Sequence, residues 1–220
     1  MKPQAIRLRQ DADDQTRVLI GTEWVPLRQA HALLSPALYA QAAREAHLLH
    51  WQRHSLHCPR CGAANEPLGP HAKRCPQCGL EQFPSVVPAV IVRIERSGDE
   101  PAILLVHARN FAQPDYYALV AGFVEPGENA EQAVQREVAE ETGLHITHLR
   151  YFASQHWPFP QQLMLAFTAQ CSPQEQPRLA DGELTNTLWA TRNDIRSGHI
   201  HIPDHASIAR WLIDDWTGNA

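Results

Sequence analysis

Two matching pairs of cysteines constrain this chain more than any other sequence feature: Cys58-Pro-Arg-Cys61-Gly and Cys75-Pro-Gln-Cys78-Gly, separated by residues 62–74. A tight C-x2-C turn aims both sulfurs at one point, so two such turns predict a tetrahedral site of four thiolates. Two disulfides are an alternative, which a reducing compartment disfavours. We predict a structural zinc ion, with a single iron ion as the rival, because about 25 residues cannot bury enough core to fold alone.

The composition is that of an ordinary soluble globular protein. The 220 residues carry 19 Lys and Arg against 24 Asp and Glu, which gives a net charge of −5, and the mean hydropathy is −0.37. This mild acidity speaks against a large non-specific nucleic-acid footprint. No apolar run approaches the roughly 20 residues of a membrane helix, and the N-terminus turns acidic before any apolar stretch, unlike a secretory signal. We therefore expect a cytoplasmic protein without a membrane partner.

The cysteine pairs separate two regions that differ in their pattern of apolar residues. Before them, short alternating segments predict strands over residues 16–20 and 23–27, and Ser35-Pro36 predicts the start of a helix. After them, apolar and β-branched runs predict further strands, and two periodic segments predict helices. The expected strands cover residues 86–94, 102–108, 117–122, 149–154, 162–169 and 184–191, and the expected helices cover residues 129–141 and 205–216.

Residues 122–144 carry the strongest sign of chemistry. Asn129 with Gln132 three residues later resembles a capping pair that starts a helix, and Gly143 is suited to end it. These residues therefore predict a helix between Asn129 and Gly143.

Three carboxylates share one face of that helix, because Glu137, Glu140 and Glu141 fall at positions i, i+3 and i+4. A solvated face of ion pairs is the alternative, but Arg136 is the only basic residue between Asn129 and Glu141. Converging carboxylates repel unless cations lie between them, and Mg²⁺ and Mn²⁺ prefer all-oxygen sites. The helix is therefore a candidate site for these ions.

The same stretch matches the pattern G-x5-E-x7-R-E-hydrophobic-x-E-E-x-G-hydrophobic at every fixed position, from Gly122 to Leu144. It thus resembles the Nudix box. Nudix hydrolases cleave a nucleoside diphosphate linked to another moiety. The resemblance implies an α/β/α sandwich around a mixed sheet, in which cations neutralise phosphate charge and help to activate a water nucleophile.

A second motif narrows the resemblance. Residues 154–162 read Ser-Gln-His-Trp-Pro-Phe-Pro-Gln-Gln, in which aromatic residues and prolines form a stiff apolar wall suited to a flat base. A rigid loop without such a role is the alternative. The segment is similar to the S-Q-P-W-P-F-P-x-S array of NADH pyrophosphatases, which also carry a four-cysteine zinc ribbon just ahead of the Nudix domain. His156 replaces the first proline of that array, and Gln162 replaces its final serine.

This resemblance implies a domain order and a set of site residues. It implies an N-terminal α+β domain over residues 1–57, a zinc ribbon over 58–83 and a Nudix hydrolase domain over 84–216. The implied catalytic residues are Arg136, Glu137, Glu140 and Glu141. The implied ligands of Mg²⁺ or Mn²⁺ are the same three glutamates, Glu183 and the carbonyl of Ala121. The implied zinc ligands are Cys58, Cys61, Cys75 and Cys78. The implied substrate-binding residues are Phe83, Gln155, His156, Trp157, Pro158, Phe159, Pro160, Gln161, Gln162 and Ala209.

The function that the resemblance implies is hydrolysis of the pyrophosphate of NADH or NAD⁺ to nicotinamide mononucleotide and AMP, by a homodimer. Removal of an NAD cap from the 5′ end of RNA breaks the same bond and is the first alternative. A Nudix hydrolase of ADP-ribose or another nucleoside diphosphate derivative is the second, and a non-catalytic nucleotide sensor is the third. We expect Arg136 to orient the neighbouring glutamates rather than to contact phosphate, because its helix neighbours lie closest to it. The general base stays unassigned.

Overall fold

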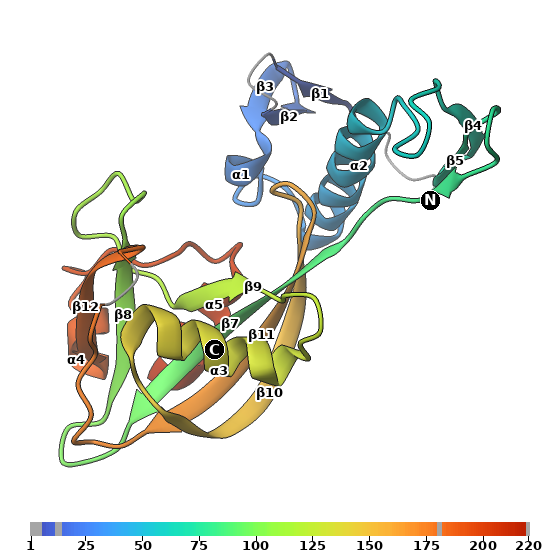
Figure 1. Cartoon of the computed structure of the whole chain (residues 1–220). Coiled ribbons are helices and arrows are strands. Elements are labelled where there is room, and N and C mark those ends of the chain that lie inside the picture. The colour runs from blue at the N-terminus through green and yellow to red at the C-terminus, as the bar shows by residue number, and fades with distance from the viewer. Residues whose placement is uncertain (1–5, 12–14, 180–181, 219–220) are drawn as a thin grey trace. The chain divides into compact units, whose positions relative to one another are not determined.

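The computed structural model describes residues 6–11, 15–179 and 182–218 (Figure 1). The chain forms two compact units. The first comprises the residues up to Val86 together with residues 156–162, and the second comprises residues 87–155 and those from 163 onward. Among the described residues, no helix has the length and apolar character needed to cross a bilayer.

The first unit begins with a small antiparallel sheet of three strands, in the order β1-β2-β3. Its helix α2 begins where the sequence predicts, because Pro36 occupies its first position and the Ser35 hydroxyl accepts a hydrogen bond from the Leu38 N–H at 3.4 Å. The elements are β1 (Leu8–Gln10), β2 (Thr16–Ile20), β3 (Glu23–Pro26), α1 (Leu27–Ala30) and α2 (Pro36–His54). Their core contains Val18, Leu27, Ala30, Ala42 and Ala46, with Phe159 packed against it.

The cysteine region adds a second small sheet to the first unit. Strands β4 (Glu66–Gly69), β5 (Ala72–Arg74) and β6 (Glu81–Gln82) pair antiparallel in sequence order. Gly62 and Gly79, each directly after the second cysteine of its turn, have φ values of 76° and 73°. Glycine adopts this left-handed conformation without strain, so it lets the chain leave each turn sharply.

The second unit is built on a six-stranded sheet with the order β10-β11-β7-β8-β12, in which β9 pairs with β7. Its strands are β7 (Val87–Arg96), β8 (Ala102–Ala108), β9 (Val120–Phe123), β10 (Ile146–Trp157), β11 (Gln162–Cys171) and β12 (Leu184–Thr191). The expected strand over residues 117–122 is wrong at its start. Tyr117 donates to the His201 carbonyl, Ala118 forms a bridge to Val106, and pairing with β7 begins only at Val120, where β9 starts.

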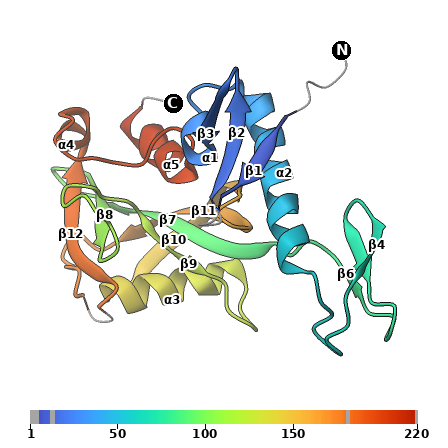
Figure 2. The same ribbon diagram turned by 90° about the horizontal axis from the view of Figure 1, so that it is seen from above.

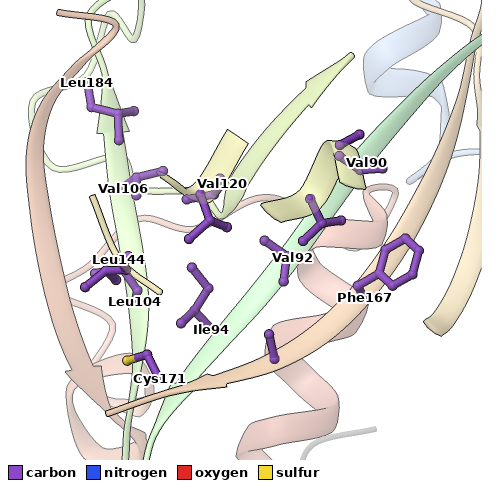
Figure 3. Close-up of a cluster of buried hydrophobic side chains, with 14 residues drawn as sticks. Val90, Val92, Ile94, Leu104, Val106, Val120, Leu144, Phe167, Cys171 and Leu184 are labelled. Carbon is purple, nitrogen blue, oxygen red and sulfur yellow. The ribbon is translucent and has the colours of Figure 1, made fainter. Parts of the chain in front are cut away.

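Alternation along the strands sends side chains to two separate cores, one on each face of the sheet. Val90, Val92 and Ile94 of β7 pack with Ala133, Val134 and Val138 of helix α3 (Ala130–Thr142) on one face (Figure 3). On the other face, Ile91, Ile103 and Leu105 pack with helices α4 (Arg192–Arg196) and α5 (Ile208–Thr217). Figure 2 shows α3 and α5 on opposite sides of the strands. The predicted α/β/α sandwich is therefore confirmed.

Candidate active site and metal centres

The box residues form a strand, a loop and a helix, as the sequence predicts. Strand β9 ends at Phe123, and α3 begins with a reciprocal cap. The Asn129 side chain accepts from the Gln132 N–H at 2.8 Å, while the Gln132 side chain accepts from the Asn129 N–H at 2.9 Å. Gly143 then ends the helix with a φ of 67°. These local signals fix the direction in which α3 projects its carboxylates.

Arg136 is the centre of the polar contacts in this region. Its guanidinium donates to both carboxylate oxygens of Glu128, at 2.7 and 2.9 Å. It also donates to Glu137 at 2.8 Å and to Glu140 at 3.1 Å. A further N–H donates to the Phe123 carbonyl at 2.8 Å, which connects the helix to the end of β9. Arg136 thus hydrogen-bonds three glutamates of the box, and its role in orienting them stays a prediction.

Gly122 provides the space in which the Glu137 carboxylate lies. A Cβ added to Gly122 would lie 2.0 Å from the Glu137 Cδ and 2.0 Å from its Oε1. Any side chain at position 122 would therefore displace this carboxylate. The backbone of β9, which includes Ala121, thus passes directly beside the carboxylate of Glu137. The φ of Gly122 is not in the left-handed region, so the backbone conformation does not require a glycine here. The glycine is needed because the Glu137 carboxylate occupies the space of a side chain.

The ionisation of the glutamates follows from these contacts. Hydrogen bonds from Arg136 hold the pKa of Glu128 below its usual range, and those bonds raise the pKa of Arg136. Burial raises the pKa of Glu137, and the charges of Glu140 and Glu183 raise it further while Arg136 opposes the change. Glu183, which precedes β12, is thus one of the charges that act on Glu137.

The glutamates differ in exposure. Glu141 is buried, at 5% exposed, whereas the side chain of Glu140 is 56% exposed and that of Glu137 is 13% exposed. This set of hard oxygen donors suits Mg²⁺ or Mn²⁺. Within the described ranges, however, the cysteines form the only group of three or more possible ligands whose donor atoms lie within 4.8 Å of one another. The carboxylates would have to draw together around an ion.

The four cysteines of the ribbon already have the geometry of a thiolate site. Cys58 Sγ lies 3.6 Å from Cys78 Sγ, and Cys61 Sγ lies 3.4 Å from Cys75 Sγ. These distances exclude disulfide bonds of about 2.05 Å and approach the S···S spacing of about 3.8 Å that follows from tetrahedral zinc. Although burial opposes ionisation, the backbone N–H groups of Arg60 and Cys61 help to lower the pKa of Cys58 to about 7. The four cysteine sulfurs are therefore a donor set that fits a zinc ion.

The aromatic array, residues 155–162, spans both units. Gln155 belongs to the second unit, where its amide donates to the Ala206 carbonyl at 2.6 Å and accepts from the Ile208 N–H at 2.8 Å. Its amide thus holds the start of α5. The remaining residues of the array belong to the first unit, where Trp157 and Phe159 contact each other edge to face at 5.1 Å.

Two further predicted substrate residues lie in different settings. Phe83 is 60% exposed at the end of the ribbon. Ala209 lies on α5, is only 3% exposed and packs into the core, so its small side chain contributes to the packing of that helix. Contact of either residue with a substrate stays a prediction.

Sequence reasoning gave no role to Glu128 and none to the close approach at Gly122. Glu128 is a fixed position of the box, and the only sequence feature that could have indicated its pairing with Arg136 is their separation of eight residues. That spacing crosses the loop before α3, so helix periodicity could not pair the two residues. The packing of Glu137 on Gly122 joins a helix to a strand, and sequence spacing does not report such a contact.

Comparison with known proteins identifies the family. The NUDIX domain matches residues 85–212, which is more than half of the chain. NAD-capped RNA hydrolase NudC of Deinococcus radiodurans is 40% identical over 200 residues, which cover 89% of this chain and 68% of that protein. This chain belongs to the NADH pyrophosphatase family of Nudix hydrolases. The resemblance carried by the box, the ribbon and the array is thereby confirmed.

Other relatives of this Nudix hydrolase support the same family assignment. The NudC proteins of Pseudomonas aeruginosa and Mycobacterium tuberculosis, which bear the same name, are 37% and 33% identical and cover 91% and 90% of the chain. The chain spans 69% and 66% of the length of these two relatives.

Solved structures support the Nudix fold. A NUDIX hydrolase from Nitrosomonas europaea aligns with a TM-score of 0.55 at 22% identity, over 74% of this chain and 93% of that one. The NUDIX domain of Shewanella oneidensis NrtR, complexed with ADP ribose, aligns with a TM-score of 0.51 at 18% identity, over 61% of this chain and 91% of that one.

Proposed function

We propose that this Nudix hydrolase cleaves the pyrophosphate of NADH or NAD⁺ to nicotinamide mononucleotide, reduced or oxidised, and AMP. The observation that carries the proposal is the complete box, in which Arg136 hydrogen-bonds Glu137 and Glu140 and the Glu137 carboxylate lies against Gly122. The relatives named NAD-capped RNA hydrolase support the choice of an NAD-like substrate. Cap removal from NAD-RNA is the same cleavage in a larger substrate, and those names favour it as the second candidate.

The chemistry uses the carboxylates as a group. Glu137, Glu140, Glu141 and Glu183, with the Ala121 carbonyl, would hold Mg²⁺ or Mn²⁺, which would supply positive charge for the phosphate oxygens and make a water easier to deprotonate. Arg136 keeps Glu137 and Glu140 at fixed positions, which limits the rearrangement needed to bind the ion. The proton of the attacking water passes to a glutamate of this group.

The aromatic array would bind the flat part of the dinucleotide. Trp157 and Phe159 present rings against which a base can stack, and stacking contributes about 1–3 kcal/mol per base in nucleic-acid sites. Phe83 and Phe123 are also exposed, at 60% and 52%, and add aromatic surface near the ribbon and the box respectively. We assign the array and Phe83 to substrate binding on this basis, and we assign Ala209 on the family resemblance alone. The division into domains over residues 1–57, 58–83 and 84–216 is part of the same proposal.

The ribbon would bind one structural zinc ion through its four cysteines. A closed set of four thiolates leaves no open position for a substrate, so the zinc would stabilise the fold and take no part in the hydrolysis. The enzyme would act in the cytoplasm, where thiols stay reduced, and as a homodimer. Analytical ultracentrifugation of the zinc-loaded chain tests the dimer directly.

Product analysis tests the proposed reaction. The full chain is incubated with NADH, NAD⁺, NAD-capped RNA or ADP-ribose, with Mg²⁺ and with Mn²⁺, and the products are separated by chromatography. We expect equal amounts of nicotinamide mononucleotide and AMP from the dinucleotides, and no turnover with a chelator. Faster turnover of NAD-capped RNA than of NADH at equal concentration would make cap removal the principal function. Cleavage of ADP-ribose alone would overturn the proposal.

A further inference from the structure

Two histidines meet in the first unit, where the array begins. His47 lies on α2 and is 6% exposed. Its Nδ1 lies 3.0 Å from the Nε2 of His156, and the two rings are nearly parallel, with an angle of 14° and 5.3 Å between centroids. The other nitrogen of His47, Nε2, lies 2.8 Å from the Ser85 carbonyl oxygen.

These contacts define which nitrogen carries each proton. A carbonyl oxygen can only accept, so the Nε2–H of His47 donates to Ser85. The Nδ1 of a neutral His47 then has a lone pair, and the Nε2–H of His156 donates to it. The hydrogen bonds therefore run in one direction, from His156 to His47 to the backbone at Ser85. Through them, the histidine of the array is attached to helix α2.

The rings that follow His156 are held by the same unit. The guanidinium of Arg28 lies 4.1 Å above the Phe159 ring and 5.7 Å from the Trp157 ring. Phe159 also packs against the small core that contains Leu27 and Ala46. The N-terminal domain thus supports the array at its aromatic rings, and the histidine contact holds the residue that precedes them.

We propose that His156 is a positioning residue, which, through its hydrogen bond to His47, orders the aromatic array for binding the base of a dinucleotide. The related array has a proline at this position, which stiffens the backbone by its ring. His156 replaces that local stiffness by a side-chain attachment to α2. The N-terminal domain thereby acquires a role in substrate affinity. This inference rests on the proposed role of the array in the hydrolysis of a dinucleotide.

Substitutions at the two histidines test it by steady-state kinetics of the full chain with NADH and Mg²⁺. His156→Phe keeps a ring but removes the donor, and His47→Phe removes the acceptor. Loss of one neutral hydrogen bond should raise the KM by about 3- to 10-fold, with kcat changed less than about 2-fold. His156→Gln should restore the wild-type KM, because the Gln side chain can place an amide N–H where the imidazole Nε2–H was. His199→Phe, at an exposed position of the second unit, is the matched control.

The double variant His47→Phe/His156→Phe separates positioning from general destabilisation. If the residues act through one contact, its KM equals that of either single variant rather than the product of the two effects. An unchanged KM in His156→Phe, failure of His156→Gln to restore it, or multiplicative effects would each overturn the inference.

Trp157→Ala distinguishes this inference from the proposed function. A raised KM in Trp157→Ala with an unchanged KM in His156→Phe would overturn the positioning role and leave the role of the array intact. An unchanged KM in Trp157→Ala would overturn the role of the array and the positioning role with it. Absence of NADH turnover in the wild-type chain would overturn the proposed function itself.

Discussion

The two candidate metal centres of this protein are organised in opposite ways. In the ribbon, four thiols lie within 4.8 Å of one another. On α3, the carboxylates are spread around Arg136, which pairs with Glu128, Glu137 and Glu140. The thiols lie close enough together for the closed site of four ligands that structural zinc requires, whereas the carboxylates lie farther apart, which suits an ion that must also contact a substrate.

The difference follows from the charge of the ligands. Thiols can be neutral, so four of them can approach one another and share hydrogen bonds without an ion. Carboxylates at neutral pH repel, and a neighbouring cation compensates part of that repulsion. Arg136 provides this cation and at the same time fixes the side chains. The first site is therefore expected to govern folding of the ribbon, and the second to govern catalysis.

Removal of a thiol should have the largest effect. In Cys61→Ser the zinc content is expected to fall from about one ion per chain to near zero, because a structural site needs all four ligands. The ribbon should then unfold, which hydrogen exchange over residues 58–83 would report. Cys171→Ala, which changes the cysteine outside the cluster, should keep the zinc. A folded ribbon without metal would contradict the structural role of the thiol site.

Removal of a carboxylate should strongly lower activity and spare the fold. Glu141→Gln is expected to lower kcat/KM by roughly 100- to 1,000-fold, because loss of a metal ligand removes several kcal/mol of charge stabilisation. The melting temperature and the zinc content should stay close to those of the wild type. Glu131→Gln, in the first turn of the same helix, is the matched control and should keep full activity. Wild-type turnover by Glu141→Gln would refute the metal-site assignment.

Both sites could be located from the sequence, but their internal organisation could not. The cysteine turns and the limits of α3 depend on residues three or four positions apart, and such signals are local. The helix expected from residue 205 begins at Ile208, because Ser207 caps it. The pairing of Arg136 with Glu128 crosses a loop, and the approach of Glu137 to Gly122 joins two elements. Both depend on tertiary structure, which periodicity does not describe.

A smaller change at the carboxylate site should act through geometry alone. In Gly122→Ala the new Cβ would displace the Glu137 carboxylate, so kcat/KM should fall by about 10- to 100-fold, as expected when a ligand moves by an ångström or so. The displaced atoms are the end of a flexible side chain, and the melting temperature should therefore change little. Gly69→Ala is the control, because its added Cβ meets no atom within 4 Å. Unchanged activity in Gly122→Ala would mean that Glu137 tolerates displacement.

The smallest expected effect concerns the pair formed by His47 and His156. Desolvation and the neighbouring His47 lower the pKa of His156. Below its usual pKa of about 6.5, the unfolded chain therefore binds more protons than the folded one, and stability should decrease as the pH falls. One proton limits the slope to about 1.4 kcal/mol per pH unit. Urea unfolding of the first unit between pH 5 and 8 would measure it. His156→Gln keeps the donor but cannot titrate, so the slope should be smaller in this variant; equal slopes would show that the pair carries no such dependence.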